Sequence, residues 1–362
     1  MASPVFVVGC PRSGTSLLNC VLFSAGRFAI YRTESHTLTV VSPRFADLRT
    51  PADREAFLEM WTGGELYRKS GLPESAARDV VLGARNAADF LRRLMEAVCE
   101  AQGATHWADS TPEHGLYLDR LKEAMPDAKV IHVVRDGRDV AASLVKQGWI
   151  RPLPWEPERK LEAAATFWAW LTKKTRENGR RLGDDYMEVR FDQLVGEREE
   201  TYARIGEFVG APVDVGRVDR AAIGSVGSPN SSFASGGGAF NPLRRWEKQY
   251  SASELGRVET LIREELEAFG FALSEDRPAR TLGEGLRRAE YQIRADFRTS
   301  LKDWPVLGRR FAGAGLITQQ AIPGDADRTL RPGDNLELIR TLVSPELPAD
   351  FDRSRIEDGQ AA

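Results

Sequence analysis

The sequence predicts an α/β fold, in which a parallel sheet carries helices on both faces and a mostly helical or irregular extension follows. Three short apolar runs have the length and composition of buried strands: 5–8, 129–134 and 186–190. Between them lie segments with apolar residues at helical spacing: near 54–61, 86–102, 113–125 and 158–181. Strands that alternate with long helices are typical of a parallel sheet covered on both sides.

Each predicted strand leads into a turn and a helix. The first is followed by the tight loop 9–16, after which Leu17, Leu18, Val21 and Leu22 recur at helical spacing. The second strand turns through 135–138 into a helix, and the third precedes helical segments that reach about residue 209.

Regular patterns become weaker toward the C-terminal end. The stretch 225–241 is rich in Ser, Gly and Asn and is expected to form a loop. Helical patterns return over 251–270 and, with basic character, near 283–301. We therefore expect one domain over residues 1–275 and an extension of unassigned role over 276–362.

The composition is that of an ordinary globular protein. The 362 residues are 42% hydrophobic and 28% charged, with a mean hydropathy of -0.37. Since 8 Trp, 16 Phe and 7 Tyr can fill a large core, we do not expect most of the chain to be disordered. The formal net charge of -3 disfavours nonspecific nucleic-acid binding, which usually needs a basic excess.

The sequence also favours a cytoplasmic and bacterial setting. No apolar run approaches the ~20 residues that span a bilayer, and the first residues do not resemble a signal peptide. The three cysteines are too few and too scattered for a disulfide framework or a zinc site. Nine lysines against 41 arginines indicate a GC-rich genome.

The loop after the first strand has the spacing of a phosphate-binding P-loop, GxxxxGK[ST]. Gly9 and Gly14 occupy the glycine positions, but Thr15 stands where the lysine is expected. Backbone amides and the start of the following helix still favour an anion, and Arg12 supplies a cation inside the loop. The second strand runs into Arg135 rather than into a metal-binding Asp, so a sheet of the P-loop type with no bound metal is predicted. The alternative is a chance match in a strand-to-helix turn.

A second anion site is predicted after the second strand. Arg135 lies at the strand end, where open α/β sheets bind ligands, and Ser143 follows two turns into the next helix. A guanidinium with a hydroxyl suits a second, separate phosphate. Alternatively, this stretch is a helix start with Asp136 near the cap. Two anion sites at two strand ends imply a nucleotide with phosphate at both ends.

These residues resemble a known family. The run 11–16 resembles the 5′-phosphosulfate loop of sulfotransferases that use 3′-phosphoadenosine 5′-phosphosulfate (PAPS), and Arg135 with Ser143 resembles their 3′-phosphate motif. Three further matches are 107–112, 189–194 and Arg245-Trp246. The resemblance covers about 3–272. It implies metal-free sulfuryl transfer from PAPS to a small-molecule, lipid or sugar hydroxyl, with no membrane span and with a homodimer left open.

Three features depart from the family pattern. Ser110 stands where relatives often have a lysine, and Phe191 stands where many have a tyrosine. The region after about residue 275 has no match. These departures leave open the interpretation that the chain is a nucleotide-binding protein that has lost its catalytic activity. The alternative enzyme class is a P-loop nucleotide kinase.

The resemblance also implies roles for individual residues. The amides of Ser13, Gly14, Thr15 and Ser16 would join Arg12 on the 5′-phosphate. Glu34 lies where the branch resembling protein-tyrosine and bacterial sulfotransferases has its catalytic base, and a solvated loop residue is the alternative.

Other candidates have weaker support. His36 is the second candidate for the base, and Ser231 and Arg190 are candidates for contact with the nucleotide. Turn chemistry explains Ser231 almost as well, and a surface role explains Arg190 equally well. His132 is interpreted as a hydrogen-bonded core residue, while the irregular stretch 148–155 is expected at the acceptor entrance or packed under a loop.

Overall fold

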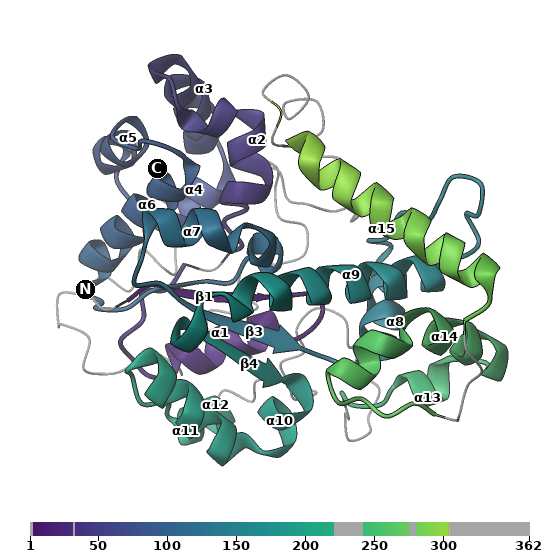
Figure 1. Cartoon of the computed structure of the whole chain (residues 1–362). Coiled ribbons are helices and arrows are strands. Elements are labelled where there is room, and N and C mark those ends of the chain that lie inside the picture. The colour runs from purple at the N-terminus through teal and green to yellow at the C-terminus, as the bar shows by residue number, and fades with distance from the viewer. Residues whose placement is uncertain (1–2, 32, 221–241, 275–279, 303, 305–362) are drawn as a thin grey trace.

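The computed structural model describes residues 3–31, 33–220, 242–274, 280–302 and 304, and Figure 1 shows their arrangement. Four parallel strands form one sheet in the order β2-β1-β3-β4. Their bounds are Val5–Gly9 (β1), Ala108–Asp109 (β2), Lys129–Val134 (β3) and Tyr186–Arg190 (β4). The three predicted strands are thus confirmed, and the two-residue β2 is an addition.

One face of the sheet buries alternate residues of the strands under a first group of helices. Val5 and Val7 of β1, with Ile131 and Val133 of β3, share a cluster with these helices. They are α1 (Thr15–Phe23), α10 (Phe191–Gly196), α11 (Arg198–Val209) and α12 (Val215–Arg220). The inward residues recur at every second position because successive strand side chains point to opposite faces.

The opposite face is covered by two further clusters. Phe6, Val8 and Val130 pack in a cluster that includes helices of the segment 51–124. These are α3 (Pro51–Thr62), α4 (Glu65–Ser70), α5 (Glu74–Leu82), α6 (Ala87–Gln102) and α7 (Leu118–Ala124). Val134 shares the other cluster with four helices. These are α8 (Gly137–Gln147), α9 (Lys160–Arg180), α14 (Ala252–Ala268) and α15 (Leu282–Lys302).

Short helical turns complete the described chain. They are η1 (Thr37–Val41), α2 (Ser42–Arg44), η2 (Ala46–Leu48), η3 (Pro112–Tyr117), η4 (Gly183–Asp185) and α13 (Trp246–Gln249). The helix expected near 113–125 is therefore divided into η3 and α7. No helix among the described residues is long and apolar enough to cross a membrane.

The basic helix expected near 283–301 is α15, which lies across the body of the protein (Figure 1). The guanidinium of Arg288 and the carboxylate of Glu265 on α14 are 2.6 Å apart and both side chains are buried. The Trp170 indole donates to Asp296 at 2.9 Å. The domain boundary near residue 275 stays a prediction, and the expected loop 225–241 lies outside the described residues.

Candidate functional site

The carboxyl ends of β1, β3 and β4 meet at one edge of the sheet, where the phosphate loop lies. Ser13 is fully buried at this edge, and its amide donates to the carbonyl of Cys10 at 3.0 Å. The Ser13 amide thus has an acceptor within the loop, and its contact with a phosphate stays a prediction. Its hydroxyl has no hydrogen-bond partner among the described residues. Buried hydroxyls are normally paired, so this oxygen fits a ligand phosphate.

Helix α1 begins directly after the loop, at Thr15. The first amides of a helix lack intrahelical acceptors and point toward any anion placed before them. Gly14 has φ +104°, and a Cβ added there would lie 2.4 Å from Cδ2 of Phe191. The ring of Phe191 thus packs directly on the loop and requires glycine at this position.

The two predicted anion motifs meet in the structure. Arg12 adopts a left-handed backbone (φ 75°), and its Nε donates to Oγ of Ser143 at 3.1 Å. Its guanidinium also lies 5.4 Å from the ring centroid of Trp149. Ser143 therefore contacts the phosphate loop, and its place in a second anion site stays a prediction.

Arg135 connects the same loop to β4. Its Nη1 donates to the carbonyl of Arg12 at 3.2 Å, and its guanidinium stacks on Phe191 at 4.6 Å. Its Nη2 donates to the carbonyl of Pro242 at 2.5 Å. The Nε is buried with no hydrogen-bond partner among the described residues. Like the Ser13 hydroxyl, this donor is positioned for an acceptor that the described residues do not supply, such as an anion.

Burial is the largest cause of the lowered pKa of both guanidiniums. Burial lowers the pKa of Arg12 to about 10, with a further contribution from Arg135, while Glu34 opposes the shift. Burial also lowers the pKa of Arg135, against the opposing charge of Asp139. Both groups remain cationic at neutral pH, and two partly desolvated cations side by side favour a polyanionic ligand.

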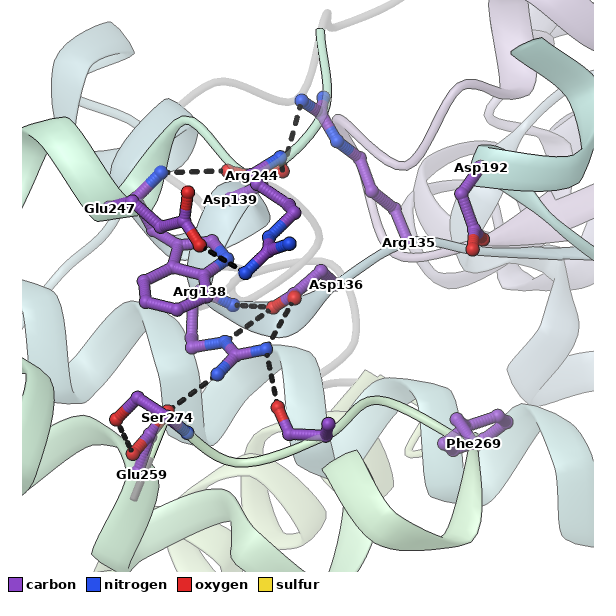
Figure 2. A network of polar contacts seen from close by, with 12 residues as sticks. Arg135, Asp136, Arg138, Asp139, Asp192, Arg244, Glu247, Glu259, Phe269 and Ser274 are labelled. Atoms are coloured by element: carbon purple, nitrogen blue, oxygen red, sulfur yellow. Dashed lines mark hydrogen bonds and ion pairs between the residues drawn. The ribbon is translucent and has the colours of Figure 1, made fainter. Parts of the chain in front are cut away.

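A buried ionic network anchors the start of α8 beside Arg135 (Figure 2). Oδ1 of Asp136 accepts from the amide of Arg138 at 2.9 Å and thereby caps the helix, as the structural alternative predicted. The Arg138 guanidinium bonds Asp136 at 2.7 Å and Glu259 of α14 at 2.5 Å. Asp139 accepts from the amides of Arg244 and Trp246. Asp139 also lies 3.7 Å from Nη2 of Arg135, so the network helps to hold this guanidinium in place.

Glu34 lies in a segment that is fixed to the family match 107–112, which is called the Thr-Pro motif here after Thr111 and Pro112. The hydroxyl of Thr111 accepts from the amide of Ser35 at 2.9 Å and from that of His36 at 3.4 Å. The same hydroxyl donates to Asp109 at 3.1 Å. Thr111 therefore joins the end of β2 to the candidate base, a role that the sequence did not indicate.

A buried histidine, His114, binds the backbone of the same segment. Nε2 of His114 accepts from the amide of Leu38 at 3.3 Å, so its proton is on Nδ1, which lies 2.9 Å from Asp109. Burial alone would raise the pKa of Asp109, but His114 and the hydrogen bonds from Ser35 and Thr111 outweigh it and lower the pKa. Asp109 is thus held as a carboxylate, and it fixes the orientation of Thr111.

The carboxylate of Glu34 faces the phosphate loop region and remains partly open to solvent. Its side chain is 43% exposed, and its Oε2 lies 3.3 Å from Nε2 of His36, which is 8% exposed. The charge of Glu34 raises the pKa of Arg12, so the two lie close together. The structure thus brings both candidate bases to the edge that holds Arg12 and Arg135.

The remaining candidates lie elsewhere or outside the described residues. His132 is buried in β3 with its Nδ1 2.7 Å from the Tyr186 hydroxyl, as predicted for a core residue. Arg190 bonds Asp192 at 2.6 Å and the carbonyl of Gly270 at 2.9 Å, and its contact with a nucleotide stays a prediction. Ser231 lies outside the described residues.

The comparison with protein families decides the assignment. Residues 4–215, more than half of the chain, match the profile of the sulfotransferase family. The chain belongs to the sulfotransferase family. Membership of this family implies PAPS as the donor. No curated protein matches the sequence.

Two solved sulfotransferase domains are similar to this chain at low identity. One comes from the olefin synthase of Synechococcus PCC 7002, with 17% identity, a TM-score of 0.41, and coverage of 80% of this chain and 94% of that chain. The other comes from the curacin biosynthetic pathway, with 15% identity, a TM-score of 0.42, and coverage of 80% and 97%.

Proposed function

We propose that this sulfotransferase transfers the sulfuryl group of PAPS to an acceptor hydroxyl, with the donor bound at the carboxyl edge of the sheet. The observation that carries the proposal is a pair of buried donors beside Arg12, the Ser13 hydroxyl and the Arg135 Nε, which have no partner in the part of the chain that the structure describes. A bisphosphorylated nucleotide would supply acceptors for both. A nucleotide with a single phosphate would supply fewer phosphate oxygens as hydrogen-bond acceptors.

Arg12 and the first amides of α1 would hold the 5′-phosphate end of the donor. During transfer, the bond between sulfur and the bridging phosphate oxygen breaks, and negative charge grows on the departing phosphate. A fixed guanidinium and backbone amides stabilise that charge because they are oriented before the reaction begins. By analogy with oxyanion-hole donors, loss of Arg12 would cost about 10²–10³ in rate.

Arg12 is also our candidate for the role of the absent lysine. Ser110 stands at the position where relatives often have a lysine, and it cannot supply a charge. Arg12 stays cationic at neutral pH, and its contacts with Ser143 and Trp149 hold it in the loop. One cation inside the loop would therefore serve both binding and departure of the phosphate.

Glu34 would take the proton of the acceptor hydroxyl as its oxygen attacks sulfur. The carboxylate is open enough to meet a substrate, and the Thr111 hydrogen bonds fix the backbone next to it. The products are the sulfated acceptor, 3′-phosphoadenosine 5′-phosphate (PAP) and a proton on Glu34. A positioned carboxylate typically contributes about 10²–10⁴ in rate as a general base.

His36 is the alternative base. Its Nε2 lies 3.3 Å from Glu34, which would then orient the imidazole rather than accept the proton from the substrate. The variant that removes the base should lose turnover and keep PAP binding, so Glu34→Gln and His36→Gln separate the two assignments.

The first experiment is thermal unfolding of the full chain with PAP, with AMP and with Mg-ATP. A ligand at about 100 times its Kd stabilises the folded state by ~2.7 kcal/mol, which is roughly 5–10 °C for a protein of this size. We expect a shift of this size with PAP and a much smaller one with AMP. A shift with Mg-ATP alone would contradict the proposal and favour the kinase alternative.

The second experiment tests the base. Glu34→Gln is expected to bind PAP as the wild type does and to lose turnover of PAPS by about 10²-fold or more. Glu59→Gln, which removes an exposed carboxylate on α3, is the matched control and should change neither quantity. Full turnover of the Glu34 variant together with a loss in His36→Gln would assign the base to His36. PAP binding without turnover of any acceptor would favour the alternative that the chain is a nucleotide-binding protein without catalytic activity.

A further inference from the structure

Helix α15 carries an apolar stripe that the rest of the described chain leaves exposed. Its members follow one side of the helix and the turn after it: Leu282, Leu286, Ile293, Phe297 and Trp304. Between 60% and 81% of each of these residues is exposed. Monomeric proteins rarely expose contiguous apolar patches of more than a few hundred Å², and larger ones usually mark a surface that another molecule covers.

The stripe lies on the side of α15 that faces away from the protein body. The residues of the helix that are buried against the body are Arg288, Tyr291, Ala295 and Lys302. At 3.6 residues per turn, this buried face and the stripe are about half a turn apart. The helix lies on the outside of the protein (Figure 1). A molecule that covers the stripe would therefore form a further layer and would leave the contacts of α15 with α9 and α14 intact.

The spacing of the stripe is the same in both chain directions. With Ile293 at the centre, the positions four, seven and eleven residues away on either side all fall on the stripe: Ala289 and Phe297, Leu286 and Ser300, Leu282 and Trp304. Steps of four, three and four residues form an 11-residue repeat, which follows a helix almost straight along its length. A two-fold axis at Ile293 would place each position of one helix opposite its symmetric position in an antiparallel copy.

The side chains that such a pair brings together are complementary in size. Phe297 would face Ala289 of the other copy, and Leu286 would face Ser300, so a large side chain meets a small one at both positions. Only Ile293 would meet itself. Five large apolar side chains at these exposures offer several hundred Å², which approaches the ~800 Å² per partner that a standard interface buries.

The charges beside the stripe are complementary as well. Glu290 and Arg294 lie one turn apart along the same edge. A two-fold axis brings the same edge of both helices together, so Glu290 of each copy would lie close to Arg294 of the other. Asp296 is exposed at the opposite edge. Acidic residues at both edges disfavour an anionic membrane surface as the partner, since helices that bind such membranes carry mainly Lys and Arg there.

We propose that α15 pairs antiparallel with α15 of a second copy of this chain, about a two-fold axis at Ile293. The two protein bodies lie on opposite sides of the helix pair, because each body is attached to the face opposite the stripe. The stripe includes no residue of the donor site. The proposal gives α15, which follows the residues matched by the family profile, the role of a dimerisation helix.

Sedimentation of the full chain over a range of concentrations measures this association. We expect the wild type to dimerise and Ile293→Glu to weaken the dimer by about 100-fold or more, because two carboxylates would be buried against each other at the axis. Ala52→Glu adds the same charge at an exposed alanine in the first turn of α3 and should dimerise as the wild type does. Circular dichroism and thermal unfolding show whether each variant is folded.

Cross-linking tests the register of the two helices without a change of charge. Ile293→Cys should be joined into dimers by a short bis-maleimide, because its two thiols lie at the axis. Leu286→Cys alone should not, since its symmetry mate is 14 positions further along the pair, or ~21 Å. A mixture of Leu286→Cys and Ser300→Cys should give a cross-linked dimer of the two variants. The wild type controls for the three native cysteines.

Charge reversal tests whether the two copies contact each other at the predicted edge. Glu290→Arg and Arg294→Glu should each weaken the dimer by about tenfold, because like charges then face each other. An equimolar mixture of the two variants should recover the association of the wild type. Opposite charges are restored only between the two copies of the mixture, so an effect within a single helix cannot produce this recovery.

Several outcomes would overturn the proposal. A wild type that stays monomeric up to about 1 mM has no interface of this kind. A dimer that Ile293→Glu leaves unchanged, and that is not cross-linked at this position, has its interface elsewhere. In a monomer, slow modification of the Ile293→Cys thiol by a maleimide would assign the stripe to residues 305–362 of the same chain, and fast modification would leave it exposed. If Ile293→Glu does not fold, the cross-linking and charge-reversal results decide. None of these measurements uses PAPS, so they are independent of the proposed function.

Discussion

Replacement of Thr111 by valine tests whether the Thr-Pro motif positions the catalytic segment. Valine has nearly the same shape but lacks the hydroxyl, which accepts from the Ser35 amide at 2.9 Å and donates to Asp109 at 3.1 Å. Thr111 is 1% exposed, so water cannot replace the lost partner easily. Both Ser35 and Asp109 would lose a hydrogen bond inside the protein.

The size of the effect follows from these two contacts. A buried amide left without an acceptor costs about 1–3 kcal/mol, and a lost hydrogen bond to a charged group costs about 1.5–3 kcal/mol. We expect the free energy of unfolding to fall by about 3 kcal/mol. Since Ser35 is next to Glu34, the proposed base would also be held less firmly, and a displacement of ~1 Å costs about 10²-fold in rate.

Two further substitutions make the measurement specific. Thr111→Ser keeps the hydroxyl and should lose only about 1 kcal/mol with the methyl group. Thr166→Val removes a buried hydroxyl that donates to the Glu162 carbonyl within α9, and its effect should stay below ~1 kcal/mol. Urea unfolding gives the stability, and PAP release at saturating PAPS gives kcat. A Thr111→Val protein with the stability and kcat of the wild type would refute the positioning argument.

Three other substitutions test the loop, the core and the ionic network. Gly14→Ala places a Cβ against the Phe191 ring and should weaken PAP binding by about tenfold or more in calorimetry. Gly71→Ala, which has a similar positive φ and open space, should leave binding unchanged. Burial lowers the pKa of His132 to about 3, so the unfolded chain binds more protons between pH 3 and ~6.5 and stability decreases as pH falls through that range, by up to about 1.4 kcal/mol per unit. His132→Asn should remove this contribution from urea unfolding curves, and an unchanged slope would contradict it. Arg138→Met leaves two carboxylates without their cation and should cost about 3–5 kcal/mol in the same assay, whereas a loss below 1 kcal/mol would contradict the role assigned to the network.

The strands and long helices were predictable because their signals are local. Buried β3 is a continuous apolar run, and α9 and α15 show apolar residues at helical spacing. The strand β2 has two residues, and it exists through its pairing with β1, in which Val5 lies opposite Ala108. No property of two residues alone distinguishes such a strand from a loop.

The site was predictable in its parts but not in its connections. The motifs identified Arg12 and Ser143, yet the hydrogen bond between them joins residues 131 positions apart and needs the left-handed backbone of Arg12. The link from Thr111 to Ser35 likewise spans 76 positions. Contacts of this kind form because the sheet places distant loops side by side. The residue spacing within one loop carries no information about that arrangement.

The donor side and the acceptor side of the site differ in how firmly the protein holds their side chains. On the donor side, Arg12 and Arg135 are held by protein contacts that do not require the nucleotide, namely Ser143, the Arg12 carbonyl and the Phe191 ring. Their charges are therefore in place before PAPS binds, which is what stabilisation of a departing phosphate requires. On the acceptor side, Glu34 is still 43% exposed. An acceptor that covers this carboxylate removes water from it, and desolvation favours the uncharged, protonated form. Binding of the acceptor would thus make Glu34 readier to take the proton at the moment when transfer needs it.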